Sequence, residues 1–386
     1  MSATLNLGTD GQWATKENSL LSYNDENGNY KPLPFDFTRA SSATVVNKAG
    51  LIETVQSGTP RIDFSDDANG SLLLEPQRTN LITYSEDFSQ WSLLSAGTGT
   101  NPIVTSNNAI SPDGTQNATK IVFDKGASSS DSDYSLIRFD NGIADIDGTA
   151  SIYLRSDVNV DIELSPDFNN YTTLNVTTEW QRFTVSDSTS DRLNMGLRGT
   201  YPSNNTATVY AWGAQLEQSS YPTSYIPTQG STVTRVAETC NGAGDVNTFN
   251  DSEGVLFVEG SLLSESINDS RISISDGASA ENRITLRYLG DNDLGVQIGF
   301  TGGFDETVSL SAGNNKVAVV YNSTTASVFV NGVKVVTNTM SSLSGLSQLQ
   351  FARFSSGTLP FYGKTKDVRV YNTALTDAEL QALTTI

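Results

Sequence analysis

Residues 209–238 read VYAWGAQLEQSSYPTSYIPTQGSTVTRVAE and contain the sharpest structural boundary of the chain. Every second residue from Tyr210 to Leu216 is apolar, which predicts a strand with one buried face. Pro222 and Pro227 lack a backbone donor and bias the residues before them toward extended conformations. These prolines predict a connector that is fastened to its domain. The stretch therefore predicts the closing strand of a β domain.

The segment before this strand consists of short β-rich runs separated by turn residues. Their number and spacing predict one antiparallel sandwich over residues 81–228. The expected strands are residues 119–123, 135–139, 149–155, 161–164, 180–185, 193–198 and 208–216.

Three tryptophans lie in this predicted domain, at positions 91, 180 and 212. An aromatic ring suits the C–H face of a pyranose, so Trp180 and Trp212 are the candidate glycan-binding residues. The alternative is that they fill the core, as most tryptophans do in a domain of this size.

A second sandwich is predicted over residues 251–386. Residues 316–336, KVAVVYNSTTASVFVNGVKVV, contain two hairpin arms and a further strand, with Asn331-Gly332 as a two-residue turn. Thr376 and Glu379 have the spacing of a capping box and predict a helix over residues 377–383. The fold class is therefore all-β, with two tandem antiparallel sandwiches.

The N-terminal part of the chain lacks a strand pattern that could close a core alone. We expect residues 1–36 to form an arm, with a turn at 25–29, that either docks on a partner or is a disordered tail. Short strands are expected over residues 37–80, packed on the next domain, and a linker over 229–250. The large apolar residues available for docking include Leu5, Leu7 and Trp13.

Composition excludes several kinds of function. The 386 residues carry 23 Lys and Arg against 43 Asp and Glu, a formal net charge of −20 that repels nucleic acids and anionic membranes. No histidine is present, which excludes Ser-His-Asp, Cys-His and histidine–metal chemistry. Cys240 is the only cysteine, so an intrachain disulfide is excluded. No signal-peptide or membrane-spanning pattern is found, so we expect no membrane insertion.

Carboxylates remain the only route to hydrolysis, as a pair acting on a glycosidic bond. Glu163 and Glu217 come nearest to a strand setting, but we expect them to face solvent or an arginine, and we predict no enzymatic activity. Structural calcium is conceivable at three acidic runs, although simple turns are the favoured interpretation. The runs are residues 63–70, 145–148 and 291–293.

Several ordered motifs resemble those of phage head-spike and tail-fibre proteins. The motifs are WGAQLE (212–217), TSYIPT (223–228), TR (234–235), FTRASSATVVNKAGLIETV (37–55), PRIDF (60–64) and LLLEPQRTNLITYSEDFSQW (72–91). This resemblance implies a carbohydrate-binding-module-like jelly roll. Residues 316–336 and 361–380 resemble the laminin-G/concanavalin-A-like lectin sandwich, which implies that fold for the C-terminal domain.

The resemblance implies a bacteriophage virion surface protein, a head or tail fibre or spike, that binds host cell-surface polysaccharide. The alternatives are a decoration protein without glycan binding and, third, a glycan-degrading depolymerase. Other virion proteins are the expected partners, with Leu5, Leu7 and Trp13 as the particle anchor. A homotrimer is the favoured assembly, and the chain is expected to be made in the host cytoplasm without a signal peptide.

Overall fold

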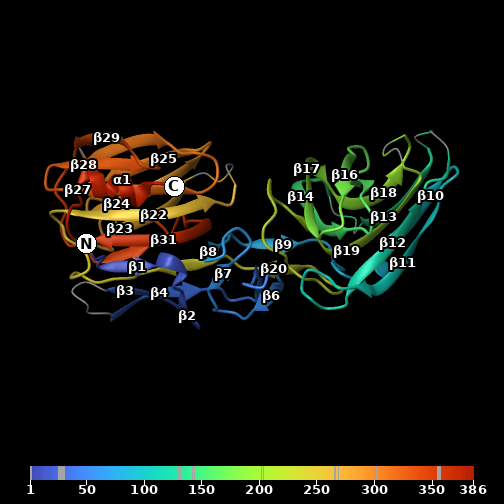
Figure 1. Ribbon diagram of the computed structural model, residues 1–386, viewed down its shortest axis with the longest axis horizontal. Helices are drawn as coiled ribbons and strands as arrows, with labels where there is room; N and C mark the ends of the chain where they lie inside the picture. The colour runs from blue at the N-terminus through green and yellow to red at the C-terminus, as the bar shows by residue number, and fades with distance from the viewer. Residues whose placement is uncertain are drawn as a thin grey trace. The chain divides into compact units, whose positions relative to one another are not determined.

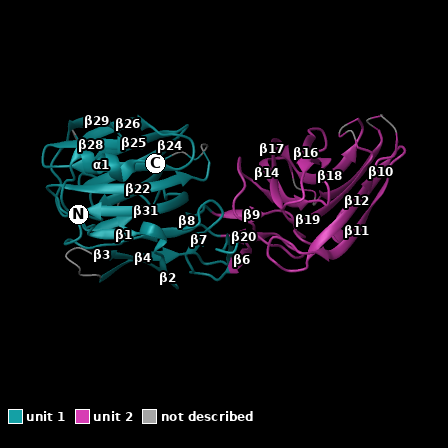
Figure 2. Ribbon diagram, viewed as in Figure 1, with its two compact units in different colours: residues 1–50, 55–76, 236–386 teal, residues 51–54, 77–235 magenta. Residues whose placement is uncertain are grey.

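The computed structural model describes residues 2–24, 31–127, 130, 132–140, 142, 144–200, 202, 204–264, 267, 269–300, 303–353 and 358–386. The chain is nearly all β, as predicted, and its antiparallel sheets form two compact units (Figure 1). Unit 1 contains residues 1–50, 55–76 and 236–386, whereas unit 2 contains residues 51–54 and 77–235 (Figure 2). The turn expected at 25–29 lies outside the described residues.

Unit 2 is built from two five-stranded antiparallel sheets, which confirms a β-sandwich in this part of the chain. One sheet has the order β10 (Ser92–Ala96), β13 (Tyr134–Asp140), β18 (Arg192–Arg198), β15 (Val160–Ser165), β16 (Thr172–Val176). The other has the order β11 (Thr100–Ala109), β12 (Ala118–Asp124), β19 (Thr206–Glu217), β14 (Ile146–Arg155), β17 (Gln181–Ser190). A short pair, β9 (Arg78–Asn80) with β20 (Val233–Arg235), joins the two ends of the segment, and η3 (Phe88–Gln90) precedes β10.

Strand β19 contains a bulge at Gly213, whose φ of 63° is a conformation that favours glycine. Before the bulge, Val209 and Ala211 face the core of unit 2; after it, Ala214 and Leu216 do. The prediction of one continuous buried face is therefore wrong, because the extra residue exchanges the two faces of the strand.

The connector after β19 is fastened to unit 2, as the prolines predict. Asn80 donates its side-chain amide to the carbonyl oxygens of Ala214, at 3.1 Å, and Ile226, at 2.8 Å. The Gln215 side chain accepts from the backbone N–H of Ile226 at 2.6 Å. Side chains of the recognised motifs thus hold the connector in place.

Unit 1 also consists of two sheets. The larger has the order β21 (Thr239–Asn241), β4 (Lys31–Thr38), β3 (Ser19–Asn24), β1 (Leu5–Leu7), β31 (Gly363–Tyr371), β22 (Gly254–Leu262), β27 (Asn315–Tyr321), β28 (Thr325–Val330), β29 (Val333–Thr339). Beside this path lie β2 (Ala14–Lys16), β7 (Arg61–Asp63) and β8 (Ser71–Leu74). The second sheet has the order β26 (Phe304–Ser309), β25 (Asp293–Ile298), β24 (Arg283–Gly290), β23 (Ser270–Ser275), β30 (Gln348–Gln350). Unit 1 also contains η1 (Thr9–Gly11), β5 (Ala43–Val46) and α1 (Asp377–Thr384), whereas β6 (Ile52–Val55) falls mostly within residues 51–54 of unit 2.

Two local predictions in unit 1 are confirmed. Asn331 and Gly332 have φ of 49° and 84° in the turn between β28 and β29, as a type I′ turn requires. The Thr376 side chain accepts from the Glu379 backbone, while Glu379 accepts from the Thr376 backbone, so α1 begins with a capping box. No helix of the described residues is long and apolar enough to cross a membrane.

The expectation of a separate N-terminal arm is wrong. Strand β1 pairs with β3 on one side and with β31 on the other, so residues from both ends of the chain share one sheet. Leu5 and Leu7 have exposed fractions of 0% and 2% and belong to the core of unit 1. Three residues are too few for a periodic pattern, and their partner strand lies more than three hundred residues away, so local reasoning could not detect the pairing.

A buried ionic cluster connects the segments of unit 1. The Arg39 guanidinium lies 2.7 Å from Glu238, and the Arg61 guanidinium contacts both Glu238 and Glu75. Burial opposes the charge of Arg61, yet Glu238 and Glu75 outweigh it and raise the pKa of the guanidinium. Glu238 also accepts from the Glu75 backbone N–H at 2.9 Å. The recognised motifs therefore supply an internal charge network.

We expect Glu238→Gln to lower the free energy of unfolding by about 3–5 kcal/mol, because two buried guanidinium groups lose their shared carboxylate. Chemical denaturation of the full chain measures this loss. The control is Asp377→Asn, which breaks an exposed pair with Lys334 and should cost about 0–1 kcal/mol. Equal effects of the two substitutions would contradict the central role of the cluster.

We expect Leu5→Ala to destabilise the chain by about 2–5 kcal/mol, the usual cost of truncating a fully buried leucine. Val246→Ala, at a position that is 66% exposed, should change stability by no more than about 0.5 kcal/mol. Thermal and chemical unfolding of both variants measure the difference. A Leu5→Ala protein as stable as the parent would contradict the core position of Leu5 and favour its role as an external anchor.

Candidate functional site

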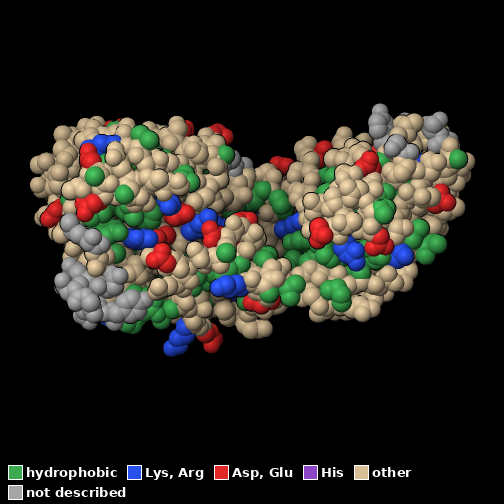
Figure 3. All heavy atoms as spheres, viewed as in Figure 1, with side chains coloured by type: hydrophobic (Ala, Val, Ile, Leu, Met, Phe, Trp, Pro, Cys, Tyr) green, Lys and Arg blue, Asp and Glu red, His purple; other side chains and the backbone are tan. Residues whose placement is uncertain are grey.

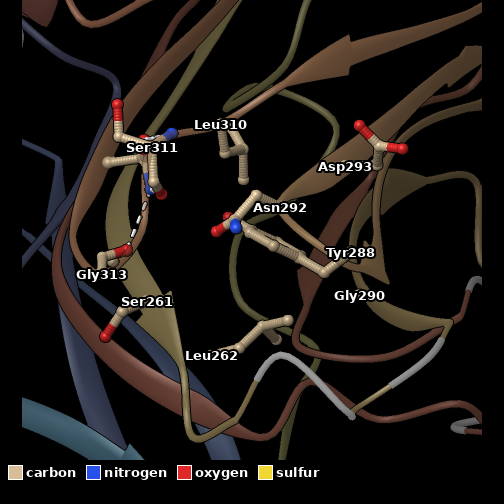
Figure 4. A pocket seen from close by; sticks show the side chains of 11 residues that line it. Ser261, Leu262, Tyr288, Gly290, Asn292, Asp293, Leu310, Ser311 and Gly313 are labelled. Atoms are coloured by element: carbon tan, nitrogen blue, oxygen red, sulfur yellow. Dashed lines mark hydrogen bonds between the residues drawn. The ribbon is translucent and has the colours of Figure 1, made fainter.

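Unit 1 contains a small pocket with about 20 Å³ of enclosed space, or about 290 Å³ when the open space at its mouth is included (Figure 4). Four segments meet there: the end of β22, the β24–β25 hairpin, the loop after β26 and the first residue of β27. The lining residues are Gly260, Ser261, Leu262, Tyr288, Gly290, Asn292, Asp293, Leu310, Ser311, Gly313 and Asn315.

A tight turn forms one wall of the pocket. Asp291 and Asn292 have φ of 50° and 62° and connect β24 to β25 as a two-residue turn of the primed type. The carbonyl oxygen of Asn292 accepts from the backbone N–H of Leu310 at 2.6 Å, which ties the hairpin to the loop after β26. The interpretation of residues 291–293 as a turn is therefore confirmed.

The Asn315 side chain organises the opposite wall. It is buried, donates to the carbonyl oxygens of Ser311 at 2.8 Å and Gly313 at 2.9 Å, and accepts from the Ser311 backbone at 2.9 Å. Asn331 of the β28–β29 turn donates to the same Asn315 side chain at 2.8 Å. The loop conformation is thus fixed by hydrogen bonds of the protein itself, which preorganises the rim for a ligand.

Apolar groups line the interior of the pocket, and polar groups line its rim. In Figure 4 the Tyr288 ring points into the space between Leu310 and Leu262. The ring also packs against Phe361, with centroids 5.1 Å apart. Burial raises the pKa of the Tyr288 hydroxyl, so the group stays protonated.

The pocket is acidic in character. Asp293 is the only carboxylate among the lining residues of the described chain, and these include no lysine or arginine. Lys316, next to the lining residue Asn315, lies 3.8 Å from Glu259 and donates to the Thr385 carbonyl at 3.0 Å. Elsewhere, on the face shown in Figure 3, basic side chains are scattered and many lie beside acidic ones.

The two tryptophans predicted to bind glycan have different environments, and neither lies in the pocket. Trp212 has an exposed fraction of 1% and packs against Tyr153 and Tyr225, with ring centroids at 5.6 and 4.6 Å. Its ring is covered by the connector and by β14, so the expectation of a sugar platform at Trp212 is wrong. The core alternative holds for this residue, and it holds also for the buried Trp91.

Trp180 is half-buried just before β17. Its indole N–H donates to the Ile110 carbonyl at 3.1 Å, and the Arg155 guanidinium lies 5.6 Å from its ring centroid. Arg155 in turn lies 4.2 Å from the Tyr210 ring centroid. A glycan contact at Trp180 stays a prediction.

The three residues expected to anchor the chain to a particle pack inside unit 1 instead. Leu5 and Leu7 lie in its core, so their assignment as an external anchor is wrong. Trp13 packs against the same core and donates its indole N–H to the Asn69 carbonyl at 2.9 Å. Intramolecular packing uses all three side chains.

The candidate carboxylates are buried. Glu217 accepts from the Gln215 side chain at 2.7 Å and from the Thr223 backbone at 2.9 Å, and Glu163 is 4% exposed, so neither faces solvent. The other expectation, that they face an arginine, stays a prediction. The described residues contain no group of three or more His, Cys, Asp or Glu side chains that could hold a metal ion. In the 63–70 run, Lys364 pairs with Asp63 at 3.0 Å, and Lys366 pairs with Asp67 at 2.9 Å.

Cys240 is the central residue of β21 and is fully buried. Burial raises the pKa of its thiol well above the usual value, and Glu238 and Asp36 act in the same direction. Such a thiol is inaccessible to a partner chain, so Cys240 serves as a core residue.

Comparisons agree with this fold. Residues 262–381, which include most of the pocket lining, match the family model described as the concanavalin A-like lectin/glucanases superfamily. Together with the sheets of unit 1, this match indicates a concanavalin A-like fold for this part of the chain. No curated protein matches the chain.

Solved structures give further similarities. The CBM40 module of the Ruminococcus gnavus IT-sialidase has a TM-score of 0.31 and 20% identity, covering 37% of this chain and 93% of that chain. Domain 4 of a GH43 extracellular arabinanase from Geobacillus stearothermophilus has a TM-score of 0.32 and 15% identity, and the match covers 42% of this chain and 80% of that chain. A leech intramolecular trans-sialidase has a TM-score of 0.29 and 21% identity, and the match covers 38% of this chain and 26% of that chain.

Proposed function

We propose that this protein binds glycans and that the pocket of unit 1 is the binding site. The observation that carries the proposal is a pocket with an apolar interior and a polar, preorganised rim in a concanavalin A-like lectin domain. Sugar hydroxyl groups both donate and accept hydrogen bonds, which suits the amide, hydroxyl and carboxylate groups of the rim. The C–H groups of a sugar suit the apolar interior.

We further propose that the chain is a bacteriophage virion surface protein, a head or tail fibre or spike, that binds host cell-surface polysaccharide. The motifs of residues 37–91 and 212–238 support this role through their resemblance to such proteins. A trimer, assembled with other virion proteins, would present several pockets together and raise the overall avidity above a weak single-site affinity. Net charge of −20 opposes nucleic-acid binding. The proposed role is binding without catalysis.

We expect Ser311→Trp to abolish glycan binding, because an indole at this exposed lining residue covers the mouth of the pocket. An array of host surface polysaccharides and defined glycans, probed with the full chain, measures saturable binding. The matched control is Ala312→Trp, which adds the same ring at an exposed neighbour outside the lining and should bind as the parent does.

Two outcomes would contradict the proposed function. If no glycan shows saturable binding, the chain is a decoration protein whose units make only structural contacts. If both tryptophan variants bind as the parent does, the ligand occupies another surface. Particle assignment is tested separately, by labelling purified phage particles with an antibody against the chain; unlabelled particles would refute it.

A further inference from the structure

The Tyr288 hydroxyl faces the pocket and has no hydrogen-bond partner among the residues that the structure describes. The side chain is 3% exposed, lines the pocket, and makes no hydrogen bond to any residue of the described chain. Another buried tyrosine of the same domain behaves differently: the Tyr321 hydroxyl donates to the Asn250 carbonyl at 2.6 Å. Because the Tyr288 hydroxyl opens onto the pocket, it is available for a hydrogen bond to a ligand there.

The interior of the pocket suits a small apolar group. Leu262, Leu310 and the Tyr288 ring contribute carbon surface, while Gly260, Gly290 and Gly313 contribute no side chain to the opening. The enclosed part of the pocket, about 20 Å³, has room for one group of about the size of a methyl, so only the end of one sugar residue could enter it. A methyl group on that residue could be buried against the two leucines.

The charges at the pocket disfavour an anionic sugar. Asp293 lies at the rim, and no arginine or lysine of the described chain is among the lining residues. Carboxylate ligands are normally held by arginine through paired charged hydrogen bonds, and this pocket lacks that donor. The carboxylate of a uronic or sialic acid would therefore be repelled by Asp293 without compensation.

We propose that the pocket binds a neutral sugar residue that carries a methyl group, either an N-acetylhexosamine or a 6-deoxyhexose. The methyl group packs against Leu262 and Leu310, and the Tyr288 hydroxyl forms a hydrogen bond with a polar group of the same residue. Tyr288 is thereby a specificity-determining residue. This inference rests on the proposed glycan binding and adds the class of sugar that the site selects.

The first test compares sugars on the full chain by calorimetry or competition. N-acetylglucosamine and N-acetylgalactosamine form one arm, and rhamnose and fucose form the other; glucose, galactose, glucuronic acid and sialic acid are the comparison set. We expect one methyl-bearing arm to bind about tenfold more tightly than the neutral sugars that lack the methyl group. We expect the two acids to bind more weakly than either.

The second test uses Tyr288→Phe, which removes only the hydroxyl. We expect the affinity for the selected sugar to fall about tenfold, the usual effect of one lost hydrogen bond, while the melting temperature stays equal or rises. Tyr321→Phe is the matched control, because its hydroxyl bonds the protein. This control should lower the melting temperature and leave sugar affinity unchanged.

The outcomes separate this inference from the proposed function. If no sugar and no polysaccharide binds, the proposed function fails. If glycans bind but Tyr288→Phe binds as the parent does, the role of Tyr288 is wrong while glycan binding stands. If glucuronic or sialic acid binds as tightly as the methyl-bearing sugars, the selection for neutral sugars is wrong.

Discussion

The ionic cluster around Glu238 is the constraint on which unit 1 depends. Its carboxylate accepts from Arg39 and Arg61, which precede residues 77–235 of unit 2, whereas Glu238 itself follows them. A charge buried this deeply is stable only with its partners in place, so the chain must return to the same point after residue 235. Once it returns, strands from both ends of the sequence complete one sheet, and this sheet supports the domain that carries the pocket.

Local rules predicted the local structure well. The Asn331-Gly332 turn, the capping box at Thr376 and the sandwich of unit 2 follow from turn chemistry, capping and alternation, which involve neighbours in sequence. The placement of Leu5 did not follow, because its pairing with Val370 depends on two segments at opposite ends of the chain. The burial of Trp212 did not follow either, because a bulge at Gly213 and a connector beyond the strand decide it.

The candidate site was only partly visible in the sequence. The turn at residues 291–293 was singled out, since adjacent Asp and Asn residues mark turns. The sequence did not indicate the loop at 311–315 or Tyr288 as part of a site. An isolated Tyr in an apolar strand has the same pattern as any core residue. What distinguishes Tyr288 is its place in the pocket with no hydrogen-bond partner among the described residues, and that is a property of three-dimensional packing. By contrast, the recognised motifs contain residues such as Arg61 and Asn80, whose side chains form ion pairs and hydrogen bonds inside the protein.

The sheet order of unit 1 has a consequence for synthesis on the ribosome. Leu5 and Leu7 pair with Val370 and Val368, which are translated some 360 residues later. At roughly 5–20 residues per second, this delay is on the order of 20–70 s. Unit 2 lies in the interval and has all its strands available long before β31 emerges, so it can fold first. During this interval strand β1 lacks its partner β31, so its apolar side chains are exposed and chaperone protection matters most.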